Sequence, residues 1–175
     1  TIHDHLRLNK VEMMEGVEAW SCSGTPVDCV KLAVYRLLKG ERPAVLVSGV
    51  NHGSNISINV LYSGTMSAAV EGAMEGIQSV GFSLMDHSIE ARFQHVRPII
   101  RGVVANVLEK GLARGTCLNV NIPRESDGPL KGVRVCRQAW GYWEDDFEAR
   151  TDPMGKEYYW LRGRFKDMDQ GEDTD

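Results

Sequence analysis

The order in which apolar segments follow one another between residues 26 and 122 is the feature that most constrains the fold of this chain. Helix-like apolar spacing alternates there with short apolar runs typical of strands. The expected elements are a helix at 26–38, a strand at 44–48, a helix at 64–75, a strand at 79–84, a helix at 90–112 and a strand at 117–122. Such alternation is typical of α/β proteins, in which right-handed crossovers connect parallel strands. We therefore predict an α/β fold with a largely parallel sheet.

Local signals mark the start of the first helix and the packing face of the second. Thr25 can cap the first helix, Pro26 suits its first position, and Asp28 places negative charge in its first turn. The second helix carries small residues that would let it lie close against a sheet, namely Ala68, Ala69, Gly72, Ala73 and Gly76. In the third helix, Pro98 is expected to cause a kink or a break.

The segments outside this alternating region are predicted to contain further strands. Residues 5–13 are expected to form a strand, with 17–21 as a short partner. Strands at 132–138 and 157–162 are expected to flank an acidic loop that carries the aromatic residues Trp140, Tyr142, Trp143 and Phe147. Residues 166–175 are acidic and have no apolar period, so we expect them to be disordered.

Charge and cysteine spacing exclude several functional classes. The formal net charge is −4 at pH 7 and no long basic block is present, so we expect no polymeric nucleic acid as a stable partner. No run approaches the roughly 18 apolar residues of a membrane span, so no membrane partner is expected. The four cysteines, Cys22, Cys29, Cys117 and Cys136, lack the paired spacing of a zinc site. Cys29, Cys117 and Cys136 lie within apolar runs and are expected to be buried, reduced thiols. A cytoplasmic protein is the resulting prediction.

The loop after the 44–48 strand is the strongest candidate for chemistry. Asn51 comes just past this strand, at the edge where ligands of open α/β sheets bind, and Asn55 follows four residues later. The carboxamide oxygen of Asn51 is a hard, neutral ligand that suits Mg²⁺ or Mn²⁺. Ser63, Gly64 and Thr65 then supply hydroxyls and free N–H groups at a helix start, where phosphate is favoured. The pattern predicts a phosphate or metal–phosphate pocket.

Simpler interpretations of the same residues remain open at this point. Asn and Gly can merely form a loop and a helix cap, and the segment is not a Walker loop because no Gly-Lys-Ser/Thr follows. His52 lies beside Asn51 and can be either a general acid or base or a solvated loop histidine.

Several blocks in combination nevertheless resemble those of one known family. They are Gly24–Val30 (GTPVDCV), Val47–Asn55 (VSGVNHGSN), Leu61–Gly72 (LYSGTMSAAVEG), Leu118–Pro123 (LNVNIP) and Asp152–Gly155 (DPMG) with Tyr159 and Trp160. Their sequence and spacing resemble the SurE family, the survival-protein E nucleotidases.

The resemblance implies a metal-dependent 5′-nucleotidase that hydrolyses nucleoside 5′- and 3′-monophosphates, with a divalent metal, Mg²⁺ or Mn²⁺, one per subunit. It also implies a Rossmann-like three-layer αβα fold with a mostly parallel sheet, an extended β-hairpin, and assembly into a homodimer or homotetramer. By position, Asn51 matches the metal ligand, and Asn55 and Ser63 match catalytic residues. Ser63, Gly64 and Thr65 match the phosphate-holding turn.

The chain is expected to depart from the family pattern at both ends. The family begins with a strand that ends in Asn-Asp-Asp-Gly and binds the metal, and no such segment precedes Thr1. The family's C-terminal arm is also expected to be missing. We therefore expect residues 1–125 to be part of a nucleotidase core that lacks the first strand, helix and metal loop. Residues 126–175 are expected to be a hairpin and oligomerisation region, and the chain alone is expected to be inactive.

Two other functions compete with this hypothesis. The loop could belong to a non-catalytic module that binds nucleotide or phosphate without metal. The chain could also be an assembly domain, whose partner surface would be formed by the aromatic residues between Trp140 and Phe147.

Overall fold

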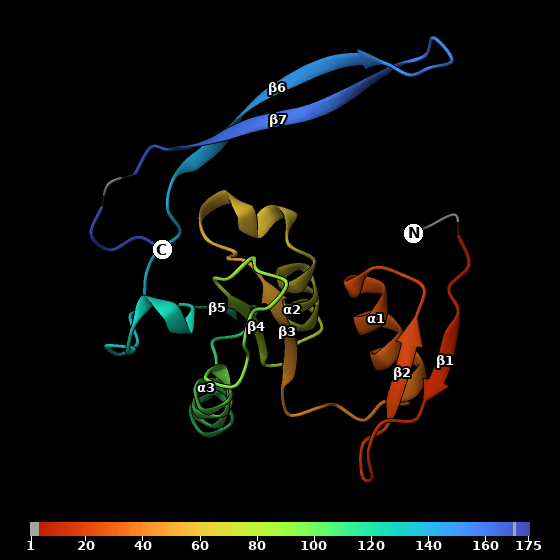
Figure 1. Cartoon of the computed structure of the whole chain (residues 1–175). Helices are drawn as coiled ribbons and strands as arrows, with labels where there is room; N and C mark the ends of the chain where they lie inside the picture. Colours follow the sequence, from red (N-terminus) through yellow and green to blue (C-terminus); the bar gives the residue numbers. More distant parts are fainter. Residues whose placement is uncertain (1–3, 170) are drawn as a thin grey trace. The chain divides into compact units, whose positions relative to one another are not determined.

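The computed structural model describes residues 4–169 and 171–175, and the chain divides into two compact units (Figure 1). Unit 1 contains Thr1–Asn55 and Leu61–Leu130, and unit 2 contains Ile56–Val60 and Lys131–Asp175. The main division thus falls after Leu130, and the short segment Ile56–Val60 belongs to the second unit although it lies within the first in sequence.

Unit 1 contains the alternating helices and strands. Its strands are β1 (Leu8–Val11), β2 (Ala19–Cys22), β3 (Leu46–His52), β4 (Ser79–Leu84) and β5 (Cys117–Ile122). Its α-helices are α1 (Pro26–Leu32), α2 (Gly64–Met74) and α3 (Val96–Lys110), and α1 continues into the π-helix η1 (Ala33–Leu37). Two 3₁₀-helices follow the same numbering: η3 (Glu125–Asp127) lies in unit 1, and η2 (Ser57–Tyr62) begins in unit 2. β1 and β2 pair antiparallel, as expected for this hairpin.

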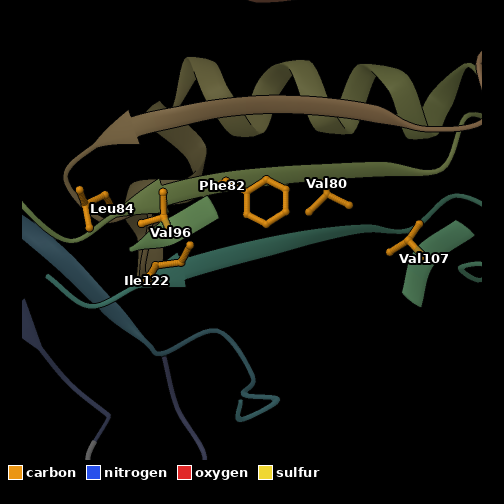
Figure 2. Close-up of a cluster of buried hydrophobic side chains, with 6 residues drawn as sticks. All are labelled: Val80, Phe82, Leu84, Val96, Val107 and Ile122. Carbon is orange, nitrogen blue, oxygen red and sulfur yellow. The ribbon is translucent and has the colours of Figure 1, made fainter. Parts of the chain in front are cut away.

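The predicted parallel sheet is confirmed. β3, β4 and β5 pair in that order and are all parallel, with β4 in the centre. Every residue of β4 is buried, because helices cover both of its faces. Val80, Phe82 and Leu84 point to one face and form the core with residues of α3 and β5, which are Val96, Val107 and Ile122 (Figure 2). Gly81, on the other face, lies against Met66 of α2. The arrangement is a three-layer α/β fold.

One expectation about the crossovers is wrong. The strands advance in one direction across the sheet, whereas α2 and α3 lie on opposite faces, so the two crossovers have opposite hands. The apolar side chains of β4 on the face away from α2 explain this, since they need a cover and α3 provides it. The connection from β4 to α3 spans residues 85–95, which is long enough to reach that face.

Three element boundaries in unit 1 differ from those expected. β3 extends to His52, past a register irregularity between Ser48 and Asn51, so the Asn51 region is a strand end. α3 begins only at Val96, which places Pro98 in the first turn, where a proline needs no backbone N–H and causes no break. In the described part of the chain, no helix combines the length and apolar character needed to cross a membrane.

The cysteines are free thiols but are less buried than expected. Cys29 is exposed on α1, whereas Cys22, Cys117 and Cys136 are partly buried. Burial raises the pKa of the Cys117 thiol, and burial together with the neighbouring Cys22 raises that of Cys29. Raised pKa values disfavour the reactive thiolate at these two positions.

Unit 2 contains the long hairpin that the family resemblance implied, but its strands differ from those expected at 132–138 and 157–162. β6 (Gly141–Thr151) and β7 (Glu157–Asp167) pair antiparallel over their whole length. The predicted strand at 132–138 is absent apart from one bridge between Arg137 and Thr174, and the predicted aromatic loop is largely β6. Aromatic residues favour strands, and the edge-to-face contact of Trp143 with Phe165, at 5.7 Å between ring centroids, shows such a cross-strand pair.

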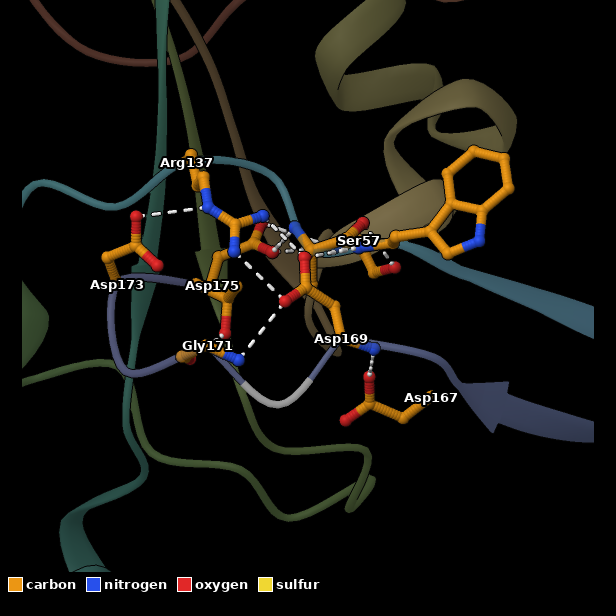
Figure 3. Close-up of polar contacts among 10 residues, drawn as sticks. Ser57, Arg137, Asp167, Asp169, Gly171, Asp173 and Asp175 are labelled. Atoms are coloured by element: carbon orange, nitrogen blue, oxygen red, sulfur yellow. Dashed lines mark hydrogen bonds and ion pairs between the residues drawn. The ribbon is translucent and has the colours of Figure 1, made fainter.

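The C-terminal segment, which we expected to be disordered, makes specific contacts within unit 2 (Figure 3). Arg137 forms ion pairs with Asp169 and with Asp173, the latter at 3.0 Å between Nε and Oδ2. The Arg137 guanidinium holds the pKa of the Asp169 carboxyl well below its usual range. Opposite charges separated along the chain therefore order a segment whose local composition favours disorder.

Asp175 adds a second set of contacts to the same segment. Its carboxylate accepts hydrogen bonds from the backbone N–H of Ser57, at 3.0 and 3.1 Å, and from that of Ala139, at 2.9 Å. The Ser57 hydroxyl in turn donates to the Ala139 carbonyl at 3.0 Å. This is why Ile56–Val60 belongs to unit 2.

Candidate functional site

Three polar side chains lie in register across the carboxyl ends of the parallel strands. Asn51 pairs with Ser83, and Ser83 pairs with Asn121. We call these three residues the polar row. Successive strand residues point to opposite faces, and Phe82 and Leu84 belong to the core on the α3 side. The polar row therefore faces the side of the sheet that α2 covers, at the edge where the sequence predicted a site.

Asn55 is bound to this row through two of its polar groups and to the neighbouring Asn119 through a third. Its backbone N–H donates to Asn121 Oδ1 at 2.8 Å, and its carbonyl accepts from Asn119 Nδ2 at 2.7 Å. Its side-chain Nδ2 donates to Ser83 Oγ at 2.6 Å, and Asn55 is only 4% exposed. Asn121 Nδ2 donates to Asn119 Oδ1 at 3.2 Å, which links the two strand asparagines. These contacts place the second candidate asparagine beside the sheet.

The segment between the two candidate asparagines is held close to the sheet edge. Asn51 Nδ2 donates to the Gly53 carbonyl at 3.0 Å, and the Gly53 N–H donates to the Leu84 carbonyl at 2.8 Å. Gly53 has a φ of +88°, and a Cβ on it would lie 2.6 Å from His87 Nδ1. A larger residue would therefore be strained there and would displace the His87 ring.

The start of α2 supplies free N–H groups on the same face. Ser63 is the N-cap, and its Oγ accepts from the Met66 N–H at 3.1 Å. The N–H groups of Gly64 and Thr65 are at the first two helical positions, which have no partner within a helix. Thr65 Cγ2 lies 3.6 Å from the position of a Cβ on Gly81, two residues before Ser83 on the same face. The candidate phosphate turn thus lies over β4, the central strand, which contributes Ser83 to the polar row.

His52 is not part of this arrangement. It follows Asn51 in β3 and therefore points to the opposite face. Its exposed ring makes an edge-to-face contact with Phe93, at 4.8 Å between ring centroids. The structure thus separates His52 from Asn51 and gives it no role as an acid or base at the polar row.

The simpler interpretation of Ser63 and Asn55 describes real contacts. Ser63 does cap α2, and Asn55 does hold a loop. These roles leave the Ser63 hydroxyl proton, the second amide hydrogen of Asn55 and the first two N–H groups of α2 for an anion. The geometry therefore permits both interpretations at once.

The described residues do not by themselves fit a divalent metal. Within residues 4–169 and 171–175 there is no group of three or more His, Cys, Asp or Glu side chains that could hold an ion. Asn51 would supply one neutral oxygen, whereas a divalent cation such as Mg²⁺ requires several oxygen ligands, usually including carboxylates. Hydrogen bonds from Thr25 at the start of α1 lower the pKa of Asp28, so this shift has a structural cause.

Sequence reasoning missed four residues of this site: Ser83, His87, Asn119 and Asn121. The alternation of the 117–122 strand contained a signal for two of them. Asn119 and Asn121 are two residues apart, so both must point to the same face of a strand. Nothing local identified Ser83 or His87, because their partners are distant in sequence.

Comparison with known proteins assigns the chain to a family. The family model described as "Survival protein SurE" matches residues 1–145. The chain belongs to the SurE family. The resemblance of the motif blocks to SurE is thereby confirmed.

Curated SurE relatives match over the whole chain. The 5′-nucleotidase SurE of Cytophaga hutchinsonii is 51% identical over 175 residues, and that of Flavobacterium psychrophilum is 54% identical over 176 residues. Each match covers 100% of this chain and 68% of the relative. The crystal structure of the SurE protein from Aquifex aeolicus matches with a TM-score of 0.78 and 32% identity, covering 99% of this chain and 68% of that one. The Rossmann-like fold that SurE membership implies agrees with this match.

Proposed function

We propose that this chain is part of a phosphomonoesterase that hydrolyses nucleoside 5′-monophosphates to nucleoside and inorganic phosphate. The observation that supports this most directly is the polar row, which faces α2 beside the free N–H groups at the start of that helix. The curated SurE relatives are named 5′-nucleotidases, which supports nucleotides as the substrate class.

In this proposal the residues of the site hold the phosphate and stabilise its charge. The N–H groups of Gly64 and Thr65 and the Ser63 hydroxyl would bind phosphoryl oxygens, since the start of a helix favours negative charge. The second amide hydrogen of Asn55 would donate to the charge that develops in the transition state. Asn51 would contribute its carboxamide oxygen as a metal ligand.

Metal dependence is a further part of the proposal. Asn51 alone cannot hold Mg²⁺ or Mn²⁺ tightly, because it adds no charge and only one ligand. The 175 residues alone are therefore expected to hydrolyse AMP far more slowly than the full-length protein. Assaying both proteins with Mn²⁺ and with EDTA tests this, and equal rates under all four conditions would refute it.

Alanine variants of the two asparagines test the assignment of the site. We expect Asn51→Ala and Asn55→Ala in the full-length protein to reduce kcat/KM for AMP by about 100-fold or more, the size of loss seen when one transition-state donor is removed. Asn106→Ala is the matched control, since this asparagine is exposed on α3 and, among the described residues, its side chain bonds to the Gly102 carbonyl alone. Wild-type rates in both site variants would show that the assignment is wrong. Hydrolysis of 3′-AMP by the same preparations tests the wider specificity.

A non-catalytic phosphate-binding module is the second candidate function. It is favoured by one observation, that the described residues contain no cluster of charged metal ligands. Calorimetry with AMP separates the two functions. Tight binding that is the same with and without Mn²⁺, in a full-length protein that releases no phosphate, would favour the module.

Assembly into a homodimer or homotetramer is proposed for the hairpin of unit 2. An isolated two-stranded hairpin is marginally stable in water, and β6 and β7 expose large apolar residues. These include Phe147 at 63%, Tyr159 at 60%, Trp160 at 54% and Leu161 at 63% exposure. A second copy of the chain would cover them. Sedimentation of a Phe147→Ser, Trp160→Ser double variant should show a smaller species, and an unchanged oligomer would argue against this role.

A further inference from the structure

The contacts of Asn55 point to a set of residues that act on the site without touching the substrate. Ser83 is fully buried, with 0% of its surface exposed, and its Oγ accepts a hydrogen bond from Asn55 Nδ2. Asn119 and Asn121 bind the carbonyl and the N–H of Asn55 from β5. Three rigid strand positions thus fix the backbone and the side chain of one loop residue.

We propose that Ser83, Asn119 and Asn121 are positioning residues that hold Asn55 in the orientation needed for phosphoryl transfer. This inference rests on the nucleotidase function proposed above. With one amide hydrogen committed to Ser83, the Asn55 carboxamide cannot rotate freely, and its second amide hydrogen keeps one direction. The second amide hydrogen is therefore the donor that the three residues aim.

The physical reason for such a support is that donors stabilise a transition state only when they are already in place. A loop asparagine that must be ordered during the reaction contributes less than one held beforehand. The segment that leads to Asn55 leaves β3 after His52 and has no helix or strand of its own, so its end would otherwise be mobile. Hydrogen bonds from the central strand and from β5 remove that freedom, which also keeps Asn51 and Asn55 at a constant separation.

The chain contains a matched control for Ser83. Ser79 is on the same strand and the same face, is also 0% exposed, and donates one hydrogen bond, to the Ile77 carbonyl at 2.9 Å. Ser79→Ala and Ser83→Ala each remove a fully buried hydroxyl from β4, so they should lower the melting temperature by similar amounts. They differ in that only Ser83 binds Asn55.

The first experiment compares these two variants in the full-length protein. We expect Ser83→Ala to lower kcat for AMP by about 10- to 100-fold, the loss that follows small misplacement of a reacting group, with a smaller change in KM. Ser79→Ala should keep kcat within about 2-fold of wild type, because it leaves Asn55 in place. Equal values of kcat in the two variants, whether both normal or both reduced, would overturn the proposal.

A second pair of variants tests the β5 side and does not depend on Ser83→Ala folding. Asn121→Asp keeps the Oδ1 acceptor for the Asn55 N–H but loses the donor to Asn119 Oδ1, whereas Asn121→Leu has a similar volume and neither group. We expect Asn121→Asp to retain more of kcat than Asn121→Leu. Amide hydrogen exchange at Asn55 should be slow in the wild type and in Asn121→Asp and fast in Asn121→Leu. Equal kcat and equal exchange in the two Asn121 variants would overturn the proposal.

Failure of this inference is distinguishable from failure of the proposed function. If the wild-type full-length protein does not hydrolyse AMP, the nucleotidase function is wrong. If it hydrolyses AMP and the paired variants behave alike, the function stands and the positioning role is wrong.

Discussion

Replacing Gly72 with alanine tests how α2 is held against the sheet. Gly72 is buried in the middle of α2, on the side that faces β3 and β4. A Cβ at this position would lie 2.8 Å from Leu46 Cδ1 and closer still to Ser79 Oγ. Gly102, in α3, provides the matched control, because a Cβ there would have no atom within 4 Å.

The two substitutions should change the free energy of unfolding in opposite directions. Alanine in an exposed helix interior gains about 1 kcal/mol over glycine, because glycine loses more conformational freedom on folding. Gly102→Ala should show this full gain. At Gly72 the same gain is opposed by overpacking, which costs about 1–3 kcal/mol. Because two neighbouring atoms would lie nearer than 3.0 Å, the cost falls in the upper part of that range. The net effect of Gly72→Ala is a loss of about 1–2 kcal/mol.

Thermal unfolding followed by circular dichroism measures this difference. For a chain of this size about 1 kcal/mol shifts the melting temperature by roughly 2–4 °C. Gly102→Ala should therefore raise it by about 2–4 °C, and Gly72→Ala should lower it by about 2–8 °C. A rise for Gly72→Ala that matched the rise for Gly102→Ala would refute the close packing of α2.

The remaining predictions concern ion pairs. Lys31→Met removes the cation, 2.5 Å away, from the Glu71 carboxylate, which is only 10% exposed. We expect a larger fall in the urea midpoint than for Lys10→Met, whose partner is exposed, and equal falls would contradict this. Arg137 lowers the pKa of Asp169, so this pair stabilises unit 2 at pH values above about 4, the ordinary pKa of an aspartate. That stabilisation is lost as the pH falls from about 4 toward the lower pKa that Asp169 has in the folded state. The protection factors of the amides in the C-terminal segment, which correct for the intrinsic pH dependence of exchange, should therefore fall in acid. Arg137→Gln should lower them already at neutral pH, and protection factors in Arg137→Gln that matched the wild type would count against the contact.

Much of unit 1 was predictable because its signals are local. Thr25 and Asp28 form the expected capping box at the start of α1, since all of the groups involved lie within four residues. The apolar run at 79–84 is β4 with the predicted bounds, and 117–122 is β5. Gly72 does lie close against the sheet, and Ala68, Ala69 and Ala73 are buried.

Unit 2 was not predictable in the same way. The segment around Trp143 was assigned to a loop because acidic residues interrupt its apolar pattern, yet it forms β6 by pairing with β7. The acidic C-terminal residues were expected to be disordered, yet Arg137 binds Asp169 and Asp173 across more than 30 residues. Both outcomes depend on a partner that local composition does not contain.

The same division applies to the candidate site. Asn51, Asn55 and the Ser63–Thr65 turn could be selected from sequence, because a strand end, short polar residues and a helix start are local features. His52 could not be assigned, since only the strand geometry shows that it points away from Asn51. The contact of Ser83 with Asn55 could not be predicted from the sequence, because nothing in the residues next to Ser83 marks it as part of a site.

By itself, the sequence determined the α/β class, the family and the position of the candidate phosphate turn, because periodicity, capping and motif spacing are properties of neighbouring residues. Only the tertiary structure decided which polar groups meet there. The parallel register aligns Asn51, Ser83 and Asn121, and this alignment binds Asn55 through residues 28 and 66 positions away. Register is set by the packing of whole strands between α2 and α3, so no local pattern could have revealed it.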